Sequence, residues 1–350
     1  MEKIKIAVIG LGLGGKNHIR SLASNDGVKL EAIVAPDSAK NSLIARHKNV
    51  PIFTTIEECL SRCNIDGVII ASPNRLHAEQ ANACIEAKIP VLIEKPITSS
   101  VEQALELVNM VEKVGAKVLI GHHRAHNPIL RVAREAINEG RLGKLVTVMG
   151  SAQFHKPAHY FVDGPWRKEI GGGPILINLI HEIDNLRRLV GEIKAVQAIT
   201  SNLTRSFDVE DTAAIIFVFE NGALGTFILS DVASTSRSWE QTSGENSSYP
   251  GYQDEDCYLI SGTNGSLGVP TMLLKYYPEG IDPSWWTPFA EEVLKAPRSD
   301  PLDCQLKHFI DVIKGDVDPL VTARDGYRNL LITEAIRESA RTKSIINVSA

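Results

Sequence analysis

The first twenty residues carry the feature that most limits how this chain can fold. A short apolar run at residues 4–9 is typical of a buried parallel strand, and it ends in Gly10-x-Gly12-x-x-Gly15, after which the sequence becomes helical. There Gly10 would allow a tight turn, Gly12 would let the backbone approach a phosphate, and Gly15 would let the helix pack on the strand. The start of the helix adds free N–H groups, so the stretch predicts a site for a dinucleotide pyrophosphate, with a plain turn as the alternative. The cofactor-binding residues expected here are Gly10, Gly12, Leu13, Gly14 and Gly15.

The composition is that of an ordinary globular protein. The 350 residues are 43% hydrophobic, enough for a large core and two domains. The net charge of −5 comes without a basic block, so neither nucleic acid nor an anionic membrane is an expected partner. No signal-peptide pattern precedes the first strand, and no apolar run reaches the ~20 residues that span a bilayer, which predicts a cytoplasmic protein. The five scattered cysteines lack zinc spacing, and we expect buried free thiols and no metal site.

Strand and helix signals alternate over the first third of the chain. Further strands are expected at 28–34, 66–71, 91–93 and 117–120, with helices between them. Strands of nearly continuous Val, Ile and Leu in such alternation predict an α/β fold, a doubly wound parallel Rossmann sheet with helices on both faces. We place this dinucleotide-binding domain at residues 1–121.

The remainder, residues 122–350, is expected to form an α+β domain that supplies the substrate face. A helix is expected at 174–190, and strand-like runs fall at 145–154, 193–203, 211–219, 223–230 and 256–261. They predict a largely antiparallel sheet with helices on one face, and a closing helix at about 324–342 is expected to pack back on the first domain. The polar stretch 234–256 is long for a loop in a compact domain, which favours either a lid or a contact with a partner subunit.

The end of the second strand bears on the choice of cofactor. An acidic residue about 20 positions after the glycines would accept hydrogen bonds from the ribose hydroxyls and repel a 2′-phosphate. Here the strand ends at Ala35, followed by Asp37 and Ser38, so no carboxylate stands at that position. Asp37 could reach back to the ribose, or it could cap the next helix together with Ser38. Alternatively, Ser38 could receive a phosphate with Arg20 and Lys40, so NAD and NADP both stay open, with NADP slightly favoured.

Polar residues follow two later strands at what would be the carboxyl edge of the sheet, where ligands of this architecture bind. A lysine at that edge would place an ammonium beside the nicotinamide, where it could bond a substrate hydroxyl. The alternative for Glu94 and Lys95 is a simple surface ion pair. The residues expected near the cofactor are Ser72, Pro73, Asn74, His77, Glu94, Lys95 and Pro96.

Together these motifs resemble the Gfo/Idh/MocA family of NAD(P)-dependent oxidoreductases, which includes inositol dehydrogenase and glucose–fructose oxidoreductase. The second half adds Trp166-Arg167, the triple glycine 171–173 and His181-x-x-Asp184, so the resemblance covers nearly the whole chain. It implies hydride transfer between NAD(P) and a secondary hydroxyl of a sugar, polyol or related small molecule. It also implies a homodimer or homotetramer formed through the open sheet face, and a cis peptide before Pro96.

By this resemblance Lys95 matches the catalytic lysine of the family, and His181 matches the histidine that takes the proton of the alcohol. The family commonly has an aspartate four residues before that histidine, where this chain has Ile177. The neighbouring Asn178 cannot take a proton and could at most bind and orient a substrate hydroxyl. The expected catalytic set is therefore Lys95 and His181, with Asp184 orienting a neighbour on the next turn. The missing aspartate supports the alternative, a non-catalytic dinucleotide-binding sensor or regulatory protein of the same fold.

Other polar residues are candidate substrate ligands, each with an ordinary packing or loop role as its alternative. Sugar sites commonly combine aromatic faces with hydrogen-bonding groups, which favours the residues ahead of the triple glycine. We further expect Lys95 and His181 to converge on one substrate oxygen. The candidate substrate-binding residues are Arg124, His155, Tyr160, Trp166, Arg167, Asn178 and His181.

Overall fold

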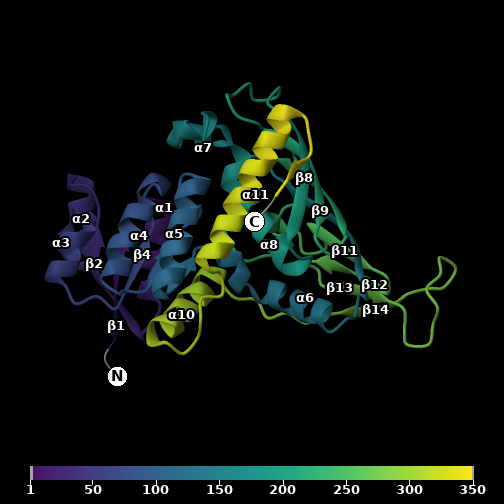
Figure 1. The fold of residues 1–350 in the computed structure, drawn as a ribbon, viewed down its shortest axis with the longest axis horizontal. Coiled ribbons are helices and arrows are strands. Elements are labelled where there is room, and N and C mark those ends of the chain that lie inside the picture. The colour runs from purple at the N-terminus through teal and green to yellow at the C-terminus, as the bar shows by residue number, and fades with distance from the viewer. Residues whose placement is uncertain (1–2, 349–350) are drawn as a thin grey trace. The chain divides into compact units, whose positions relative to one another are not determined.

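The computed structural model describes residues 3–348 (Figure 1). They form two compact units, which are described separately. Unit 1 comprises the chain up to His126 together with Pro301–Leu330, and unit 2 comprises Asn127–Asp300 together with the residues from Leu331 onward. The chain therefore returns to unit 1 late in the sequence, a return that a simple division into residues 1–121 and 122–350 does not include.

Unit 1 is built on the predicted parallel sheet of six strands, in the order β3-β2-β1-β4-β5-β6. Val8, Ile69 and Leu92 are fully buried, as expected for strands that lie between two helix layers. The order reverses at β1, which lies between β2 and β4, and this reversal marks the edge where ligands of doubly wound sheets bind. The strands are β1 (Ile4–Ile9), β2 (Val28–Val34), β3 (Ile52–Phe53), β4 (Gly67–Ile70), β5 (Val91–Ile93) and β6 (Val118–Ile120).

The helices of unit 1 form two layers, since α1 packs with α10 while α4 packs with α3 and α5. Several begin at a side-chain cap: Ser38, Thr55 and Ser100 each accept a hydrogen bond from the backbone N–H three residues on. The first helix differs, because its N-cap is Gly12 and no side chain caps it. The helices are α1 (Leu13–Ala23), α2 (Ala39–Lys48), α3 (Ile56–Arg62), α4 (His77–Glu86), α5 (Val101–Val114), α10 (Pro301–Lys314) and the start of α11 (Ala323–Thr342).

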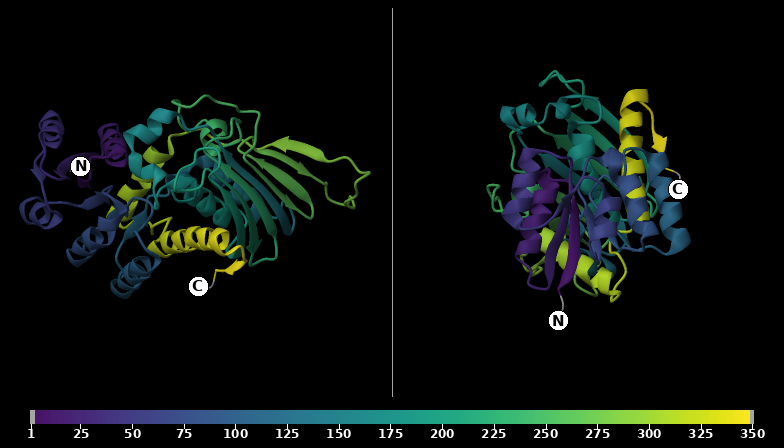
Figure 2. Two further views of the ribbon diagram at one scale, coloured as in Figure 1. Left: turned by 90° about the horizontal axis from the view of Figure 1, so that it is seen from above. Right: turned by 90° about the vertical axis from the view of Figure 1, so that its left-hand side faces the viewer.

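Unit 2 holds a sheet of nine strands, in the order β14-β13-β12-β11-β7-β10-β9-β8-β15 (Figure 2). All of its described pairs are antiparallel except β7 with β10, so the prediction of a largely antiparallel sheet is confirmed. The strands are β7 (Leu145–Gln153), β8 (Ile193–Ser201), β9 (Thr212–Phe219), β10 (Leu224–Ser230), β11 (Tyr258–Gly262), β12 (Gly265–Val269), β13 (Leu273–Tyr276), β14 (Ala290–Val293) and β15 (Ile346–Asn347).

Side chains alternate across this sheet. Ile215 and Phe217 are buried, whereas Ile216 between them is 47% exposed. The buried side forms one core with apolar residues of α6 (Pro128–Asn138), α8 (Ile180–Leu189) and α11. One face is therefore covered by helices, as predicted, and the other carries exposed apolar side chains.

The stretch 234–256 contains the short helix α9 (Trp239–Thr242). Trp239 is fully buried, its ring stacks on Tyr258 at 6.1 Å, and its Nε1 donates to Glu245 at 2.6 Å. Asn127 donates to the same carboxylate oxygen at 3.0 Å. The middle of this polar stretch is thus anchored in the core of unit 2.

All five cysteines are free. Cys59, Cys84 and Cys257 are buried as predicted, whereas Cys63 and Cys304 are only half-buried. Burial raises the pKa of the Cys59 and Cys84 thiols to about 12, so these two remain protonated at neutral pH. None of the described helices combines the length and the apolar character that crossing a bilayer requires.

Candidate active site

The glycine turn between β1 and α1 leaves room for a ligand at one glycine only. Gly10 has φ of +92°, and a Cβ there would lie 2.5 Å from the Ala71 carbonyl oxygen. A Cβ on Gly15 would lie 1.9 Å from the Gly10 carbonyl oxygen, so both positions need glycine for the fold itself. A Cβ on Gly12 would meet nothing within 4 Å, and the first turn of α1 carries no acidic residue. An uncapped helix start beneath open space fits a dinucleotide pyrophosphate.

The two other residues of this turn face in different directions. Leu13 is 76% exposed. A Cβ on Gly14 would lie 3.7 Å from the Ala71 side chain and 3.8 Å from that of Glu94. The turn is therefore packed against the ends of β4 and β5, where the sequence predicted the remaining cofactor residues.

Glu94 is held inside this edge. His18 of α1 donates to its Oε1 at 2.8 Å, and the backbone N–H of Lys95 donates to its Oε2 at 3.2 Å. Burial would raise the pKa of Glu94, but the His18 hydrogen bond and the charges of His18, His123 and Lys95 lower it to about 2. Glu94 is thus an inward-facing carboxylate bonded to His18, and the alternative of an ion pair with Lys95 stays open.

His77 ties the two polar motifs together. Its ring nitrogens lie 2.9 Å from the Ser72 carbonyl oxygen and 3.0 Å from that of Pro96, and its side chain is buried. Burial lowers the pKa of His77 despite these contacts. The Lys95–Pro96 peptide is cis, which confirms that prediction. Asn74 begins a short 3₁₀ turn that leads into α4.

The end of β2 shows the features expected from the sequence. Ala35 is buried, and Asp37 is exposed two residues beyond it. Ser38 accepts a hydrogen bond from the Asn41 N–H at 3.2 Å, so it caps α2. The capping role of Ser38 is confirmed, while the roles of Asp37 and Ser38 toward a cofactor remain predictions.

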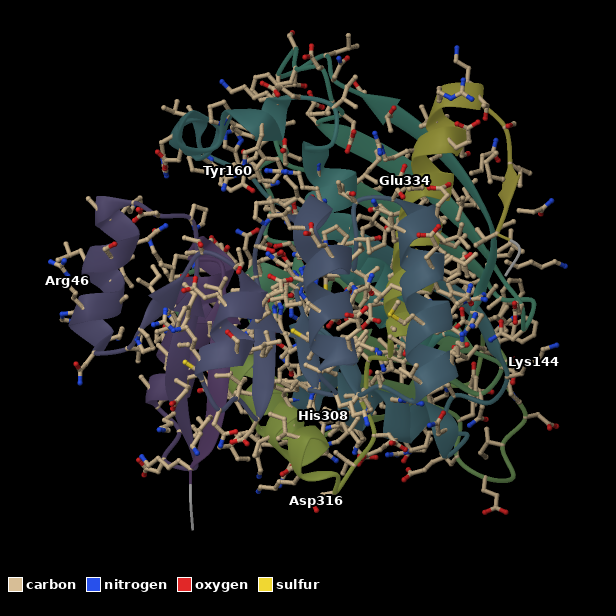
Figure 3. The ribbon with its side chains drawn as sticks, turned by 60° about the vertical axis from the view of Figure 1, so that its left-hand side comes forward. Arg46, Lys144, Tyr160, His308, Asp316 and Glu334 are labelled. Carbon is tan, nitrogen blue, oxygen red and sulfur yellow. The ribbon has the colours of Figure 1, made fainter. Side chains whose placement is uncertain are left out.

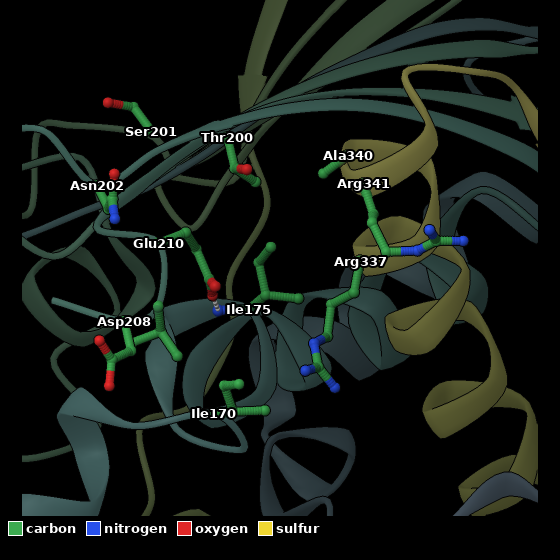
Figure 4. Close-up of a pocket in the computed structure, with 11 residues that line it drawn as sticks. Ile170, Ile175, Thr200, Ser201, Asn202, Asp208, Glu210, Arg337, Ala340 and Arg341 are labelled. Atoms are coloured by element: carbon green, nitrogen blue, oxygen red, sulfur yellow. Dashed lines mark hydrogen bonds between the residues drawn. The ribbon is translucent and has the colours of Figure 1, made fainter.

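In unit 2 the triple glycine leads into a π-helical turn, Ile175–Leu179, directly before α8. Gly173 has φ of +81°, and a Cβ there would lie 2.6 Å from Oε1 of Glu210. That oxygen accepts the N–H of Ile175 at 2.9 Å, in a pocket that Arg337 also lines (Figure 4). Burial raises the pKa of Glu210. Glycine is therefore required here so that Glu210 can reach the start of the π turn. Single π-helical turns are often found at functional sites.

His181 lies in the first turn of α8 and is 6% exposed. Its neighbours in this helix make two polar contacts, one with β11 and one within α8 itself. Glu182 accepts a hydrogen bond from the Tyr258 hydroxyl, and Asp184 accepts one from Arg188 Nε at 2.8 Å. Asp184 thus contacts a neighbour on the next turn, as expected, and α8 is held against the core of unit 2.

Asn178 in the π turn contacts a lysine that the sequence analysis did not select. Its Oδ1 accepts a hydrogen bond from Lys156 Nζ at 2.7 Å. Lys156 is 8% exposed, and its Nζ lies 5.0 Å from the Tyr160 ring centre and 3.7 Å from Asp231. Arg205 donates to the same carboxylate at 2.7 Å. The only sequence signal for this cluster was its place in the polar run before the triple glycine.

The remaining candidate substrate ligands are spread more widely. Tyr160 belongs to the α7 segment (Ala158–Asp163) and is labelled in Figure 3. The guanidinium carbon of Arg167 lies 3.8 Å from the centre of the Tyr160 ring. Burial raises the pKa of Tyr160. Trp166 is 53% exposed, and His155 is exposed with its Nδ1 donating to the Val232 carbonyl oxygen at 2.9 Å.

The structure therefore joins Tyr160, Arg167 and Asn178 around Lys156 in unit 2. Arg124 is buried in unit 1. Lys95 also belongs to unit 1 and His181 to unit 2, so their convergence on one substrate oxygen stays a prediction.

Comparison with known proteins defines the class first. A model described as "Oxidoreductase family, NAD-binding Rossmann fold" matches residues 4–122, and the GFO/IDH/MocA C-terminal domain model matches residues 130–268. The two matches together span most of the chain. The chain belongs to the Gfo/Idh/MocA family of NAD-binding oxidoreductases, as its motifs predicted.

Several relatives are similar over most of their length. The rhizopine catabolism protein MocA of Rhizobium meliloti is 25% identical over 97% of this chain and 95% of its own. The 1,5-anhydro-D-fructose reductase of Ensifer adhaerens is 27% identical over 83% and 81%. The structure of the WlbA dehydrogenase from Bordetella pertussis in complex with NADH and UDP-GlcNAcA matches with a TM-score of 0.79 and 24% identity over 100% of both chains. That structure shares the fold described above.

Proposed function

We propose that this protein is an NAD(P)-dependent dehydrogenase that acts on a secondary hydroxyl of a sugar, polyol or related small molecule. The observation that carries the proposal is the position of Lys95, which directly follows the inward-facing Glu94 at the cofactor edge of the unit 1 sheet. The chain is similar to the reductase of Ensifer adhaerens and to the WlbA dehydrogenase, and the names of both are those of redox enzymes, which supports the proposal.

The chain's own residues would hold the cofactor at the glycine turn. The N–H groups at the start of α1 would bind the pyrophosphate above Gly12, and the motifs after β4 and β5 would line the nicotinamide side. When bound, the nicotinamide supplies the acceptor for hydride. NADP is slightly favoured, because Ala35 offers no carboxylate to the ribose. The side chains of Arg20 and Lys40 are both exposed and could receive a 2′-phosphate.

In the proposed reaction the hydroxyl proton passes to an imidazole nitrogen of His181. An imidazole, with an ordinary pKa of about 6.5, can accept this proton at physiological pH. The ammonium of Lys95 stabilises the alkoxide that develops on the substrate oxygen. Ile177 offers no carboxylate, so His181 would act as the base without an aspartate one turn before it.

Assays of cofactor reduction across sugars and polyols, with NAD and NADP in parallel, test this proposal. His181→Ala should lower kcat by about 10²–10⁴-fold and leave the Kd of the cofactor nearly unchanged, whereas Lys95→Ala should lower kcat and also weaken cofactor binding. His47→Ala removes an exposed histidine of α2 and serves as the matched control. Tight cofactor binding without turnover of any compound would instead favour the sensor or regulatory role.

We also propose a homodimer or homotetramer formed through the open face of the unit 2 sheet. Leu259, Met149 and Ile216 lie on that face, and strand pairing places them in one cross-strand row with Thr226. All three apolar side chains are at least 36% exposed. Exposed apolar side chains gathered in this way on a sheet face are typical of a protein interface.

A further inference from the structure

The amide of Asn178 has an acceptor end and a donor end, and its neighbour decides which end faces the protein. The Lys156 ammonium carries three N–H donors and no acceptor. Only Oδ1 of Asn178 can therefore face it, and the 2.7 Å separation is that of a charge-assisted hydrogen bond. The two N–H groups on Nδ2 consequently point away from Lys156. Nδ2 has no hydrogen-bond partner among the described residues, and Asn178 is only half-buried, so these donors are available to a ligand.

Lys156 is well placed to fix this orientation. Its side chain is buried, and its Nζ lies 5.5 and 5.0 Å from the ring centres of Phe154 and Tyr160. The carboxylate of Asp231 lies 3.7 Å from this Nζ and accepts a closer ion pair from Arg205 at 2.7 Å. The contact of the Lys156 ammonium with Asn178, at 2.7 Å, is thus shorter than its contact with Asp231, and the ammonium is held in a buried position.

We propose that Lys156 is a positioning residue that makes Asn178 a hydrogen-bond donor to the substrate, and that the substrate carries a carboxylate close to the carbon that is oxidised. This inference rests on the proposed dehydrogenase function. An aspartate in this region would accept a hydrogen bond from a substrate hydroxyl, whereas the Asn178 amide held by Lys156 offers only N–H groups outward. The group it recognises must therefore be an acceptor.

Two features favour a carboxylate as that acceptor. Arg167 lies 3.8 Å from the same Tyr160 ring that faces Lys156, so two cations flank one ring beside the amide. Asn178 precedes His181 by three residues, across the junction between the π turn and α8, so the two residues lie within about one helical turn of each other. The acceptor would thus lie within one or two carbons of the hydroxyl that His181 deprotonates. The substrate class is a hydroxy acid of the sugar series.

The test compares ligands that differ only in this group: D-gluconate against D-glucitol, and D-glucuronate against D-glucose. Their Kd values are measured by calorimetry with reduced cofactor bound, and KM and kcat by oxidation assays. Wild type should prefer the acids. Lys156→Met keeps the length of the side chain and frees the amide to flip, so the preference for the acid should fall about 10- to 100-fold, in Kd and KM more than in kcat. Lys168→Met removes a nearby lysine that lies 5.3 Å from the Phe207 ring and should leave the preference unchanged.

Asn178→Asp provides a second variant that leaves Lys156 intact. It replaces the outward N–H groups by a carboxylate oxygen and should turn the preference toward the neutral ligands. The inference is overturned if wild type binds acids and neutral compounds equally, or if a folded Lys156→Met or Asn178→Asp protein keeps the wild-type preference. Because the Kd values need no turnover, a failure of dehydrogenase activity would show separately in the oxidation assay.

Discussion

The open space above Gly12 leads to a prediction that separates cofactor binding from folding. Gly12→Ala adds a Cβ that meets no atom within 4 Å, at a residue with φ of −67° and ψ of −168°, which alanine adopts without strain. Gly15→Ala places the same Cβ 1.9 Å from a backbone oxygen, which can be relieved only by moving α1 or the turn. The two substitutions are chemically identical and only three residues apart.

The two substitutions are expected to change different quantities, the affinity for the dinucleotide in one case and the free energy of unfolding in the other. Gly12→Ala should change the free energy of unfolding by less than about 0.5 kcal/mol, as for other substitutions that touch nothing. It should nevertheless weaken dinucleotide binding by about 10- to 100-fold, because the methyl group keeps a phosphate from one charge-assisted N–H bond worth about 1.5–3 kcal/mol. Gly15→Ala should lower the free energy of unfolding by about 1–3 kcal/mol, the usual effect of overpacking.

Urea unfolding followed by circular dichroism gives the stabilities, and titration of protein fluorescence with NADH and NADPH gives the Kd values. The reasoning requires Gly12→Ala to fold like wild type and bind the dinucleotide poorly. If this variant bound both dinucleotides with wild-type affinity, the pyrophosphate would not approach Gly12, and the assignment of the glycine turn as its cradle would be refuted.

Two further predictions follow from single side chains. The pKa of Glu94 is about 2 against an ordinary 4.5, so this carboxylate adds about 3 kcal/mol of stability above pH 4.5 that is lost as the pH falls from 4.5 toward 2. Glu94→Gln should flatten this acid limb in urea midpoints measured from pH 2 to 7, and an unchanged limb would contradict the sign. Ile216→Glu should reduce the mass seen by light scattering, whereas Val114→Glu on α5 should not, and a monomeric wild type would contradict the proposed interface.

The Rossmann sheet was predictable because its strands are short continuous apolar runs separated by helical patterns. The strand that escaped, β3, has only two residues, Ile52 and Phe53, which is too short for any periodicity to show. In unit 2 the strands β12 to β15 escaped for related reasons. The sequence of β14 is Ala-Glu-Glu-Val, and all four residues are at least partly exposed, so neither an apolar run nor an alternation marks it as a strand.

The cluster around Asn178 shows a different limit. Sequence reasoning selected His155, but the structure exposes His155 and buries its neighbour Lys156, because consecutive side chains of an extended segment point to opposite sides. The alternation of side chains along an extended segment does not show which side faces inward when both neighbouring residues are polar. The partner atom on Asn178 lies 22 residues further along the chain, so only the folded structure brings the two together.

The stretch 234–256 shows what its length and polarity do not reveal. A lid or a contact with a partner subunit stays a prediction for it, but one residue, Trp239, is fully buried and bonded to Glu245 within the same stretch. A single tryptophan buries a large apolar area, so one such side chain can anchor a segment that is otherwise polar. Average polarity over a long segment therefore says little about where its one large apolar side chain goes.

The absent aspartate can be understood from the way α8 is held. A carboxylate beside a catalytic histidine fixes the ring and favours its charged form, and Ile177 can do neither. In this chain the backbone around His181 is instead fixed by Lys156 on Asn178 before it and by Tyr258 on Glu182 after it. These contacts restrain the helix turn that carries the imidazole. A turn held in this way meets the need for fixed positioning that the proposed dehydrogenase reaction would place on His181, even with Ile177 in place of a carboxylate.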